Sequence, residues 1–253
     1  MARVTNPPES KLDPVIAQQS EAGWHRWLDQ LGHQPERVAG FGALIGLAFM
    51  VGVVAMYAFI RLADEVLEQQ TVAFDTTAST VILSYQSAPM DVLMHTLSLF
   101  GSEIVTVLSL LLVALFVWQR RWGAGVLLIA VVGGAQLLDD VLKALFHRIR
   151  PMPVGGFIDA QQYSFPSGHA MTSAAFYFFM TYLVWQLLGG VWRGVVVIGL
   201  LTLVILVGIS RIYLQAHYLS DVLAGYVAGF IWADTLIIAS QTLAPRRRRR
   251  LNA

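Results

Sequence analysis

The sequence has no cysteine and little charge. The absence of Cys from its 253 residues excludes disulfides, thiolate nucleophiles and cysteine-ligated metals. Charged residues make up 13% of the chain and hydrophobic residues 56%, a balance that excludes an ordinary soluble domain. The net charge of +1 gives no indication of a nucleic-acid partner, and we expect none. The composition instead indicates a chain that is embedded in a lipid bilayer.

Long apolar runs fill most of the chain after residue 37. The run at about residues 38–60 is too long for a signal-peptide core and follows a long polar leader, so it predicts a retained anchor. A polar segment at about residues 61–90 follows. Five further runs predict spans, the first of them breaking near Gly101: about residues 91–118, 122–146, 169–188, 194–213 and 218–240. The sequence therefore predicts an all-α membrane bundle of six spanning helices.

Both ends of the chain are polar. Residues 1–37 carry Ile16, Trp24, Trp27, Leu28 and Leu31 at a spacing that would make one apolar stripe if helical, which is typical of an interfacial amphipathic helix. Residues 241–253 include five consecutive arginines. We therefore expect a cytoplasmic amino-terminal segment (1–37), one membrane domain (38–240) and a basic cytoplasmic tail (241–253).

The distribution of Lys and Arg predicts the orientation of the bundle. Cytoplasmic flanks of membrane helices are enriched in these residues. With six spans, the amino-terminal segment, Arg120 and Arg121, Arg193 and the arginine tail all fall on one side. We expect that side to be the cytoplasm, with both termini there. The small architecture and the strong positive-inside pattern favour a bacterial inner membrane.

Three polar clusters interrupt the apolar sequence. Polar groups are costly at membrane depth, so this many of them predict a site that handles an anion. The topology above, which was counted without them, brings all three to the outer face. The clusters are Lys143 with Arg150-Pro151, then Pro166-Ser167-Gly168-His169, then Ser210-Arg211 with His217 and Asp221.

The residue types in these clusters suit phosphate chemistry. His217 and Asp221 are four residues apart and share a helix face, so the carboxylate can fix one ring nitrogen and leave the other as a nucleophile. Ser167 and Gly168 stand at an expected helix start, where backbone N–H groups bind anions. The alternative for both pairs is an ordinary helix cap at the membrane interface.

Three cations accompany the histidines. Lys143, Arg150 and Arg211 can neutralise a phosphoryl group whose transition state spreads negative charge over its oxygens. The alternative for Lys143 is snorkelling toward lipid headgroups. Asp139 and Asp140 precede Lys143 by four and three residues; we expect them to orient Lys143 or Arg148, the alternative being a part in substrate selection.

The clusters match, position for position, the three signature motifs of the type 2 phosphatidic acid phosphatases, and the chain resembles that family of membrane lipid phosphatases from about residue 91 to 240. The resemblance implies catalysis without a metal or other cofactor, in which the histidine nucleophile forms a phosphohistidine. It implies these roles: His217 as nucleophile, Asp221 orienting it, His169 as general acid and then base, Lys143, Arg150, Ser167, Gly168 and Arg211 binding phosphoryl oxygens, and Pro151, Pro166 and Ser210 completing the motifs.

The expected function is hydrolysis of a lipid phosphate or diphosphate that enters from the outer leaflet. Undecaprenyl diphosphate is the substrate that we expect first, and phosphatidic acid, phosphatidylglycerophosphate and diacylglycerol diphosphate compete with it. One alternative is a phosphotransferase that passes the phosphoryl group to another lipid headgroup. A second alternative is a transporter or structural membrane protein whose buried charges serve an ion path. The sequence makes no prediction of the oligomeric state.

Overall fold

The computed structural model describes the backbone of residues 35–151 and 163–251, and the side chains of residues 46–151 and 163–242. Within these ranges the protein is all-helical, with an isolated bridge between Ile149 and Tyr163. The chain divides into two compact units, Met1–Leu47 and Ala48–Ala253. An interfacial helix is expected within residues 1–37. Residues 1–34 lie outside the part of the chain that the structure describes.

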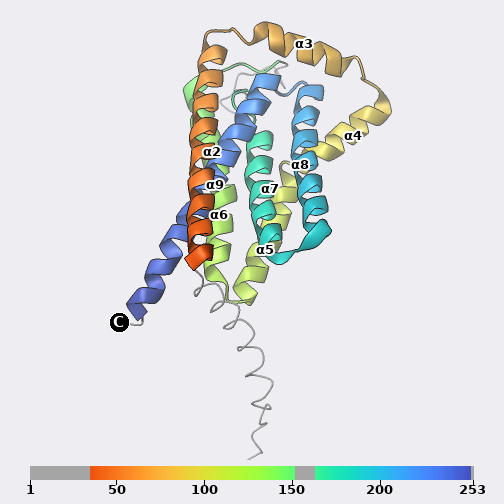
Figure 1. Cartoon of the computed structure of the whole chain (residues 1–253). Coiled ribbons are helices and arrows are strands. Elements are labelled where there is room, and N and C mark those ends of the chain that lie inside the picture. The colour runs from red at the N-terminus through yellow and green to blue at the C-terminus, as the bar shows by residue number, and fades with distance from the viewer. Residues whose placement is uncertain (1–34, 152–162, 252–253) are drawn as a thin grey trace, which may run out of the picture. The chain divides into compact units, whose positions relative to one another are not determined.

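Helices follow one another along the described chain (Figure 1). Five stretches are long and apolar enough to cross a bilayer: Gly46–Leu67, Ala88–Trp118, Trp122–Phe146, Gly190–Tyr213 and Leu219–Thr242. The all-helical fold predicted from the sequence is confirmed for the described residues, and these stretches are consistent with a membrane protein. The helices are α2 (Pro35–Leu67), α3 (Val72–Leu83), α4 (Ala88–Leu99), α5 (Glu103–Trp118), α6 (Trp122–Phe146), α7 (Gly168–Leu187), α8 (Gly190–Tyr213) and α9 (Leu219–Leu251).

The break expected near Gly101 is present between α4 and α5. The helix α4 ends at Leu99 and α5 begins at Glu103. Figure 1 shows α4 running obliquely to α5. Only α5 therefore runs along the bundle, and α4 reaches α8 from the side.

The polar segment expected at residues 61–90 is largely helical, which the sequence pattern did not predict. The helix α2 continues to Leu67, and α3 lies across one end of the bundle (Figure 1). The hydroxyls of Thr76, Thr77 and Thr80 donate to main-chain carbonyls four residues earlier, at 2.7–2.8 Å, so these polar side chains are satisfied within the helix. The segment also contributes a buried carboxylate, Asp75, which is 1% exposed.

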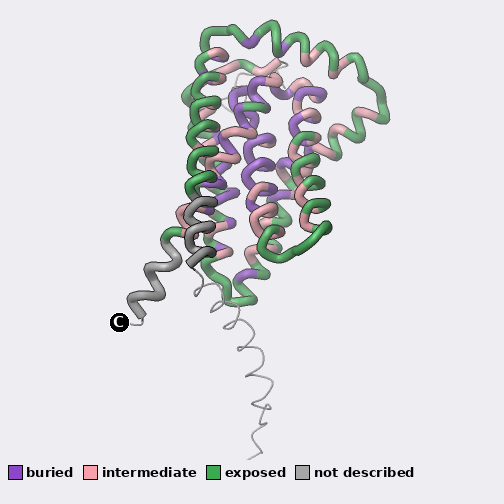
Figure 2. Tube along the Cα trace, viewed as in Figure 1, coloured by how far each residue is buried: buried purple, intermediate pink, exposed green. Residues whose placement is uncertain are grey.

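The helix α7 lies in the interior of the bundle and is coloured as buried along its first half in Figure 2. It packs against α6, α8 and α9. It is not one of the five apolar stretches, because residues such as His169, Thr172 and Ser173 make it more polar. Because neighbouring helices cover it, α7 does not have to present apolar side chains to lipid. The predicted count of six spans therefore depends on including α7.

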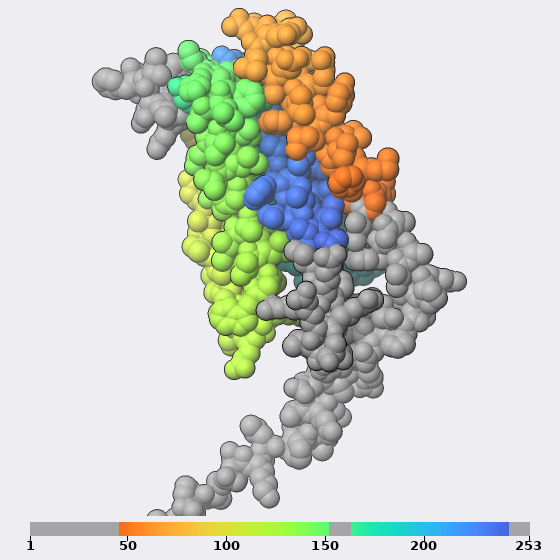
Figure 3. Space-filling view, turned by 90° about the vertical axis from the view of Figure 1, so that its left-hand side faces the viewer, coloured from red at the N-terminus to blue at the C-terminus, as the bar shows by residue number. Residues whose placement is uncertain are grey.

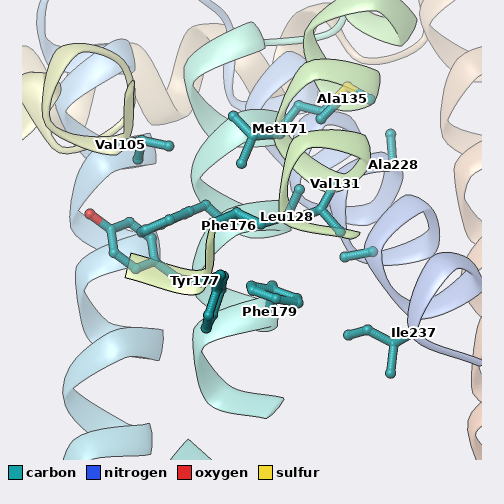
Figure 4. Packing of buried hydrophobic residues seen from close by; sticks show 14 residues of the cluster. Val105, Leu128, Val131, Ala135, Met171, Phe176, Tyr177, Phe179, Ala228 and Ile237 are labelled. Carbon is teal, nitrogen blue, oxygen red and sulfur yellow. The ribbon is translucent and has the colours of Figure 1, made fainter. Parts of the chain in front are cut away.

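The core is built around aromatic and aliphatic side chains of α7. In Figure 4, Met171, Phe176 and Phe179 lie among Leu128 and Val131 of α6. Lipid tails are as apolar as these side chains, so the helices associate through close packing rather than through removal of water. The shape of each contact therefore matters more than its hydrophobicity.

Two glycines of α9 permit close approach of its backbone to that of α7. A Cβ added to Gly229 would lie 2.2 Å from the carbonyl oxygen of Met171, and one added to Gly225 would lie 2.6 Å from that of Ser167. Their spacing of four residues is the small-xxx-small pattern of tightly packed membrane helices. The sequence reading missed this pair, which brings the start of α9 against the start of α7.

Many large hydrophobic side chains are exposed on the described helices. Large hydrophobic side chains of α2 are more than half exposed, for example Phe49, Val54 and Tyr57 at 64%, 65% and 66%. Figure 3 shows α9 between α6 and α2 on one face. Exposed apolar side chains of this kind are suited to contact with lipid.

Candidate active site

Four helix ends meet at one end of the bundle. The helices α6 and α8 end there, and α7 and α9 begin there (Figure 1). They surround a cavity of about 450 Å³. The three polar clusters predicted from the sequence are therefore brought together. The lining residues are Lys143, Arg150, Gly168, His169, Arg211 and His217 from the clusters, with Gly101, Ser102, Gln136, Asp139, Asp140 and Thr172.

The ring of His217 is held in one orientation. It is 2% exposed, and its Nδ1 lies 2.8 Å from the main-chain oxygen of Ser164. A carbonyl oxygen only accepts hydrogen bonds, so Nδ1 carries the proton and Nε2 keeps its lone pair. Burial lowers the pKa of His217 to about 4, and the charges of Arg211 and Arg150 act in the same direction. At neutral pH the ring is therefore an uncharged base.

The carboxylate of Asp221 reaches His217 through Ser164. Its Oδ2 lies 3.8 Å from Nδ1 of the ring, which is within ion-pair range but too long for a hydrogen bond. The expectation of a direct hydrogen bond from His217 to Asp221 is therefore corrected, because the carbonyl of Ser164 accepts the ring N–H. The carboxylate instead accepts hydrogen bonds from the Ser164 hydroxyl and from the N–H of Tyr218, the latter at 2.8 Å.

Arg211 has two hydrogen-bond donors of interest, Nη1 and Nε. Its Nη1 donates to Ser98 Oγ at 2.6 Å. Its Nε is buried and has no hydrogen-bond partner among the described residues. A buried donor in this state is costly unless a ligand oxygen satisfies it. Arg211 therefore has hydrogen-bonding capacity left for an anion.

Lys143 is paired with an acid. Its Nζ donates to Asp139 Oδ2 at 2.6 Å, one helical turn away on α6. Asp140 is exposed and also lines the cavity. This geometry agrees with an orienting role of Asp139 toward Lys143.

The start of α7 is fitted closely against this pair. Gly168 opens the helix, and a Cβ there would lie 2.4 Å from Asp139 Oδ2 and 3.2 Å from Lys143 Nζ. Ser167 precedes it as the N-cap, and its buried hydroxyl has no partner in the part of the chain that the structure describes. The N–H of Ser167 donates to the main-chain oxygen of Asp221 at 3.0 Å, which ties the second cluster to the third.

The remaining motif residues lie around the cavity without lining it. Ser210 is buried and donates its hydroxyl to the carbonyl of Val207 at 2.6 Å. Pro166 is buried behind the start of α7 and follows a cis peptide bond. Pro151, which is partly exposed, follows Arg150.

Two further residues join the site that sequence reasoning did not place there. Arg148 donates from Nη1 to Asp221 Oδ1 at 2.5 Å and from Nη2 to Asp75 Oδ2 at 2.8 Å. The sequence named Arg148 only as a residue that Asp139 or Asp140 could orient, whereas its carboxylate partners are Asp221 and Asp75. No local signal indicated Asp75, because its partners are far away in the sequence.

An apolar helical bundle that encloses two histidines and three cations at one end defines a class of protein: a membrane protein with a site suited to phosphoryl transfer. The sequence profile described as the PAP2 superfamily matches residues 124–244. The protein YbjG of Escherichia coli (strain K12), named as a candidate undecaprenyl-diphosphatase, is 31% identical over 170 residues, which are 63% of this chain and 80% of that protein. The chain therefore belongs to the PAP2 superfamily, and the family resemblance seen in the sequence is confirmed.

Two comparisons with Bacillus subtilis agree with this membership. Phosphatidylglycerophosphatase B of strain 168 is 30% identical over 133 residues, which are 52% of this chain and 64% of that protein, so the match spans just under two thirds of the relative. The crystal structure of a transmembrane PAP2-type phosphatidylglycerolphosphate phosphatase superimposes with a TM-score of 0.68 at 27% identity, covering 76% of this chain and 96% of that one. These relatives indicate a membrane lipid phosphatase of the PAP2 type.

Proposed function

We propose that this chain hydrolyses a membrane lipid phosphate or diphosphate through a phosphohistidine intermediate. The observation that carries the proposal is the convergence of two histidines and three cations around one cavity. The unsatisfied Nε of Arg211 supports an anionic ligand there, since phosphoryl oxygens would accept from it.

The phosphoryl group is held by charge and by the start of a helix. Lys143, Arg150 and Arg211 line the cavity, and together they would neutralise the oxygens of the phosphoryl group. The first N–H groups of α7, at Gly168 and His169, have no carbonyl one turn earlier within the helix, so they are available to an anion at its amino terminus. The transition state spreads charge over these oxygens, so the same groups stabilise it.

In the first half of the reaction, Nε2 of His217 attacks phosphorus. A P–N bond forms, the bond from phosphorus to the leaving oxygen breaks, and His169 gives that oxygen a proton. For a diphosphate, the leaving group is the lipid monophosphate. The ring of His217 becomes positively charged and keeps its proton on Nδ1, where the Ser164 carbonyl and the nearby Asp221 carboxylate stabilise it.

In the second half, water replaces the histidine. His169, now without its extra proton, takes a proton from a water molecule whose oxygen attacks phosphorus. The P–N bond breaks, inorganic phosphate leaves, and the neutral ring of His217 is restored. The same two histidines therefore act in both halves, and His169 changes from acid to base.

We propose undecaprenyl diphosphate as the first substrate to examine. The name of the Escherichia coli relative supports it, while the names of the Bacillus subtilis relatives support phosphatidylglycerophosphate. Phosphatidic acid and diacylglycerol diphosphate present the same phosphoryl group. The same cavity residues would bind the phosphoryl group of each of these lipids.

We also propose six membrane crossings, with α7 as the crossing that the five apolar stretches omit. Both termini then lie in the cytoplasm and the cavity opens at the outer face of a bacterial inner membrane. In this arrangement residues 38–240 form the phosphatase domain, residues 1–37 an interfacial segment and residues 241–253 a basic tail. The distribution of Lys and Arg supports this orientation.

Phosphate release by the purified protein in EDTA tests the function. A panel of isoprenoid diphosphates and glycerolipid phosphates is supplied at equal surface concentration, with a labelled lipid acceptor present. Free phosphate that disappears in His217→Ala supports hydrolysis. A labelled acceptor instead identifies a phosphotransferase, and unchanged activity of His217→Ala would exclude His217 as the nucleophile.

A further inference from the structure

Arg148 connects two buried carboxylates from different helices. It lies in the connection after α6, donates to Asp221 of α9 at 2.5 Å and donates to Asp75 of α3 at 2.8 Å. Asp75 and Asp221 are 1% and 0% exposed. Removing both acids from water is expensive, and the guanidinium between them compensates for that cost. The three side chains together carry one net negative charge.

Asp75 also holds the first turn of α9. Its Oδ1 accepts the N–H of Ser220 at 2.9 Å and its Oδ2 accepts the Ser220 hydroxyl at 2.7 Å. Nη1 of Arg148 donates to that same hydroxyl oxygen at 2.7 Å. The guanidinium lies over the ring of Tyr218, 4.3 Å from its centroid. The residue beside Asp221 is thus fixed by α3.

The network continues to the nucleophile. Arg148 occupies Oδ1 of Asp221, which leaves Oδ2 for the Ser164 hydroxyl and the N–H of Tyr218. The carbonyl of the same Ser164 accepts the N–H of His217. Displacement of Asp221 would therefore move Ser164, and with it the direction in which Nε2 of His217 points.

We infer that Asp75 and Arg148 are positioning residues for the nucleophile, acting through Asp221 and Ser164. The inference rests on the proposed function, in which the ring of His217 becomes positive during attack. The net negative charge of the Asp75, Arg148 and Asp221 group stabilises that ring, and their hydrogen bonds fix its direction. Asp75 and Arg148 do not line the cavity of the two histidines; both line a separate cavity beside it.

The test compares Asp75→Asn with a matched buried carboxylate. Asp75→Asn keeps a similar shape and removes the negative charge. We expect kcat to fall about 10- to 100-fold, the range for loss of a partner that orients a reacting group, with KM unchanged within about threefold. Inhibition by inorganic phosphate should be unchanged, because Lys143 and Arg211 remain. The control is Asp234→Asn, a 6% exposed acid in the middle of α9, which should keep kcat.

Each other outcome overturns the inference. Full kcat in Asp75→Asn excludes a positioning role. A rise of KM and of the phosphate inhibition constant at constant kcat identifies a substrate-binding role. An equal loss of kcat in Asp234→Asn identifies a general effect of buried charge.

A second variant covers the case in which Asp75→Asn does not fold. Ser220→Ala keeps every charge and removes the hydroxyl between Asp75 and Arg148. A fall of kcat of about 3- to 10-fold at constant KM, corresponding to one hydrogen bond, supports the inference, and unchanged kcat contradicts it. Activity that survives in His217→Ala would contradict the proposed function instead, so the two failures are distinguishable.

Discussion

Gly168→Ala is a small change for which the structure predicts a large loss of activity. The added methyl carbon would lie 2.4 Å from Asp139 Oδ2, a distance at which the carbon and the oxygen overlap. Relief requires movement of the carboxylate by up to about 1 Å, and Asp139 holds Lys143 at 2.6 Å. A misplacement of that size in a catalytic site costs on the order of 100-fold. We therefore expect kcat/KM to fall by about that factor.

Phosphate release by purified Gly168→Ala, compared with Gly199→Ala, measures this effect. Gly199 lies in α8, and a Cβ there has no atom within 4 Å, so the control makes the same chemical change in open space. Asp139→Ala removes the oxygen that the methyl group meets. If the clash is the cause, adding Gly168→Ala to Asp139→Ala should cost little more. Full activity in Gly168→Ala, or additive losses in the double variant, would refute the reasoning.

Three further predictions concern the nucleophile and the packing that supports it. The acid limb of kcat/KM should lie near pH 4, well below the pKa of about 6.5 for a free imidazole, because burial disfavours the protonated ring of His217. A pH profile corrected for ionisation of the substrate measures this limb, and a limb near pH 6.5, the pKa of a free imidazole, would contradict the prediction. Ser164→Ala removes a hydrogen bond to the buried Asp221 carboxylate, and kcat should fall about 10-fold or more at constant KM in steady-state assays, whereas an unchanged kcat would exclude the link. Gly229→Ala should lower the free energy of unfolding in detergent by about 1–3 kcal/mol, because the added Cβ would overlap the Met171 carbonyl oxygen. Unchanged stability would mean that α7 and α9 can move apart freely.

Much of the site was predictable because its chemistry is written in local patterns. The three clusters pair each histidine or cation with a neighbour at fixed spacing, and polar groups at membrane depth are too costly to occur without a role. Gly101 likewise marked the break between α4 and α5 within a continuous apolar run. These features need no knowledge of distant contacts.

The contacts that were missed are set by tertiary packing. The acids and threonines after residue 61 indicated a polar segment, but α3 satisfies its threonine hydroxyls internally and buries Asp75 against Arg148. The expected bond from Asp221 to His217 was displaced because Ser164, which lies far away in the sequence, comes between them. Hydrophobic periodicity gives no information about either contact. The close approach at Gly229 is hidden for the same reason.

Trapping of the covalent intermediate tests the central claim most directly. The purified protein is mixed with a lipid phosphate labelled in the transferred phosphoryl group, quenched in alkali and digested, and the labelled peptide is identified by mass spectrometry. The account predicts an acid-labile label on His217 that is absent from His217→Ala. Label on another residue, or continued phosphate release by His217→Ala, would contradict it.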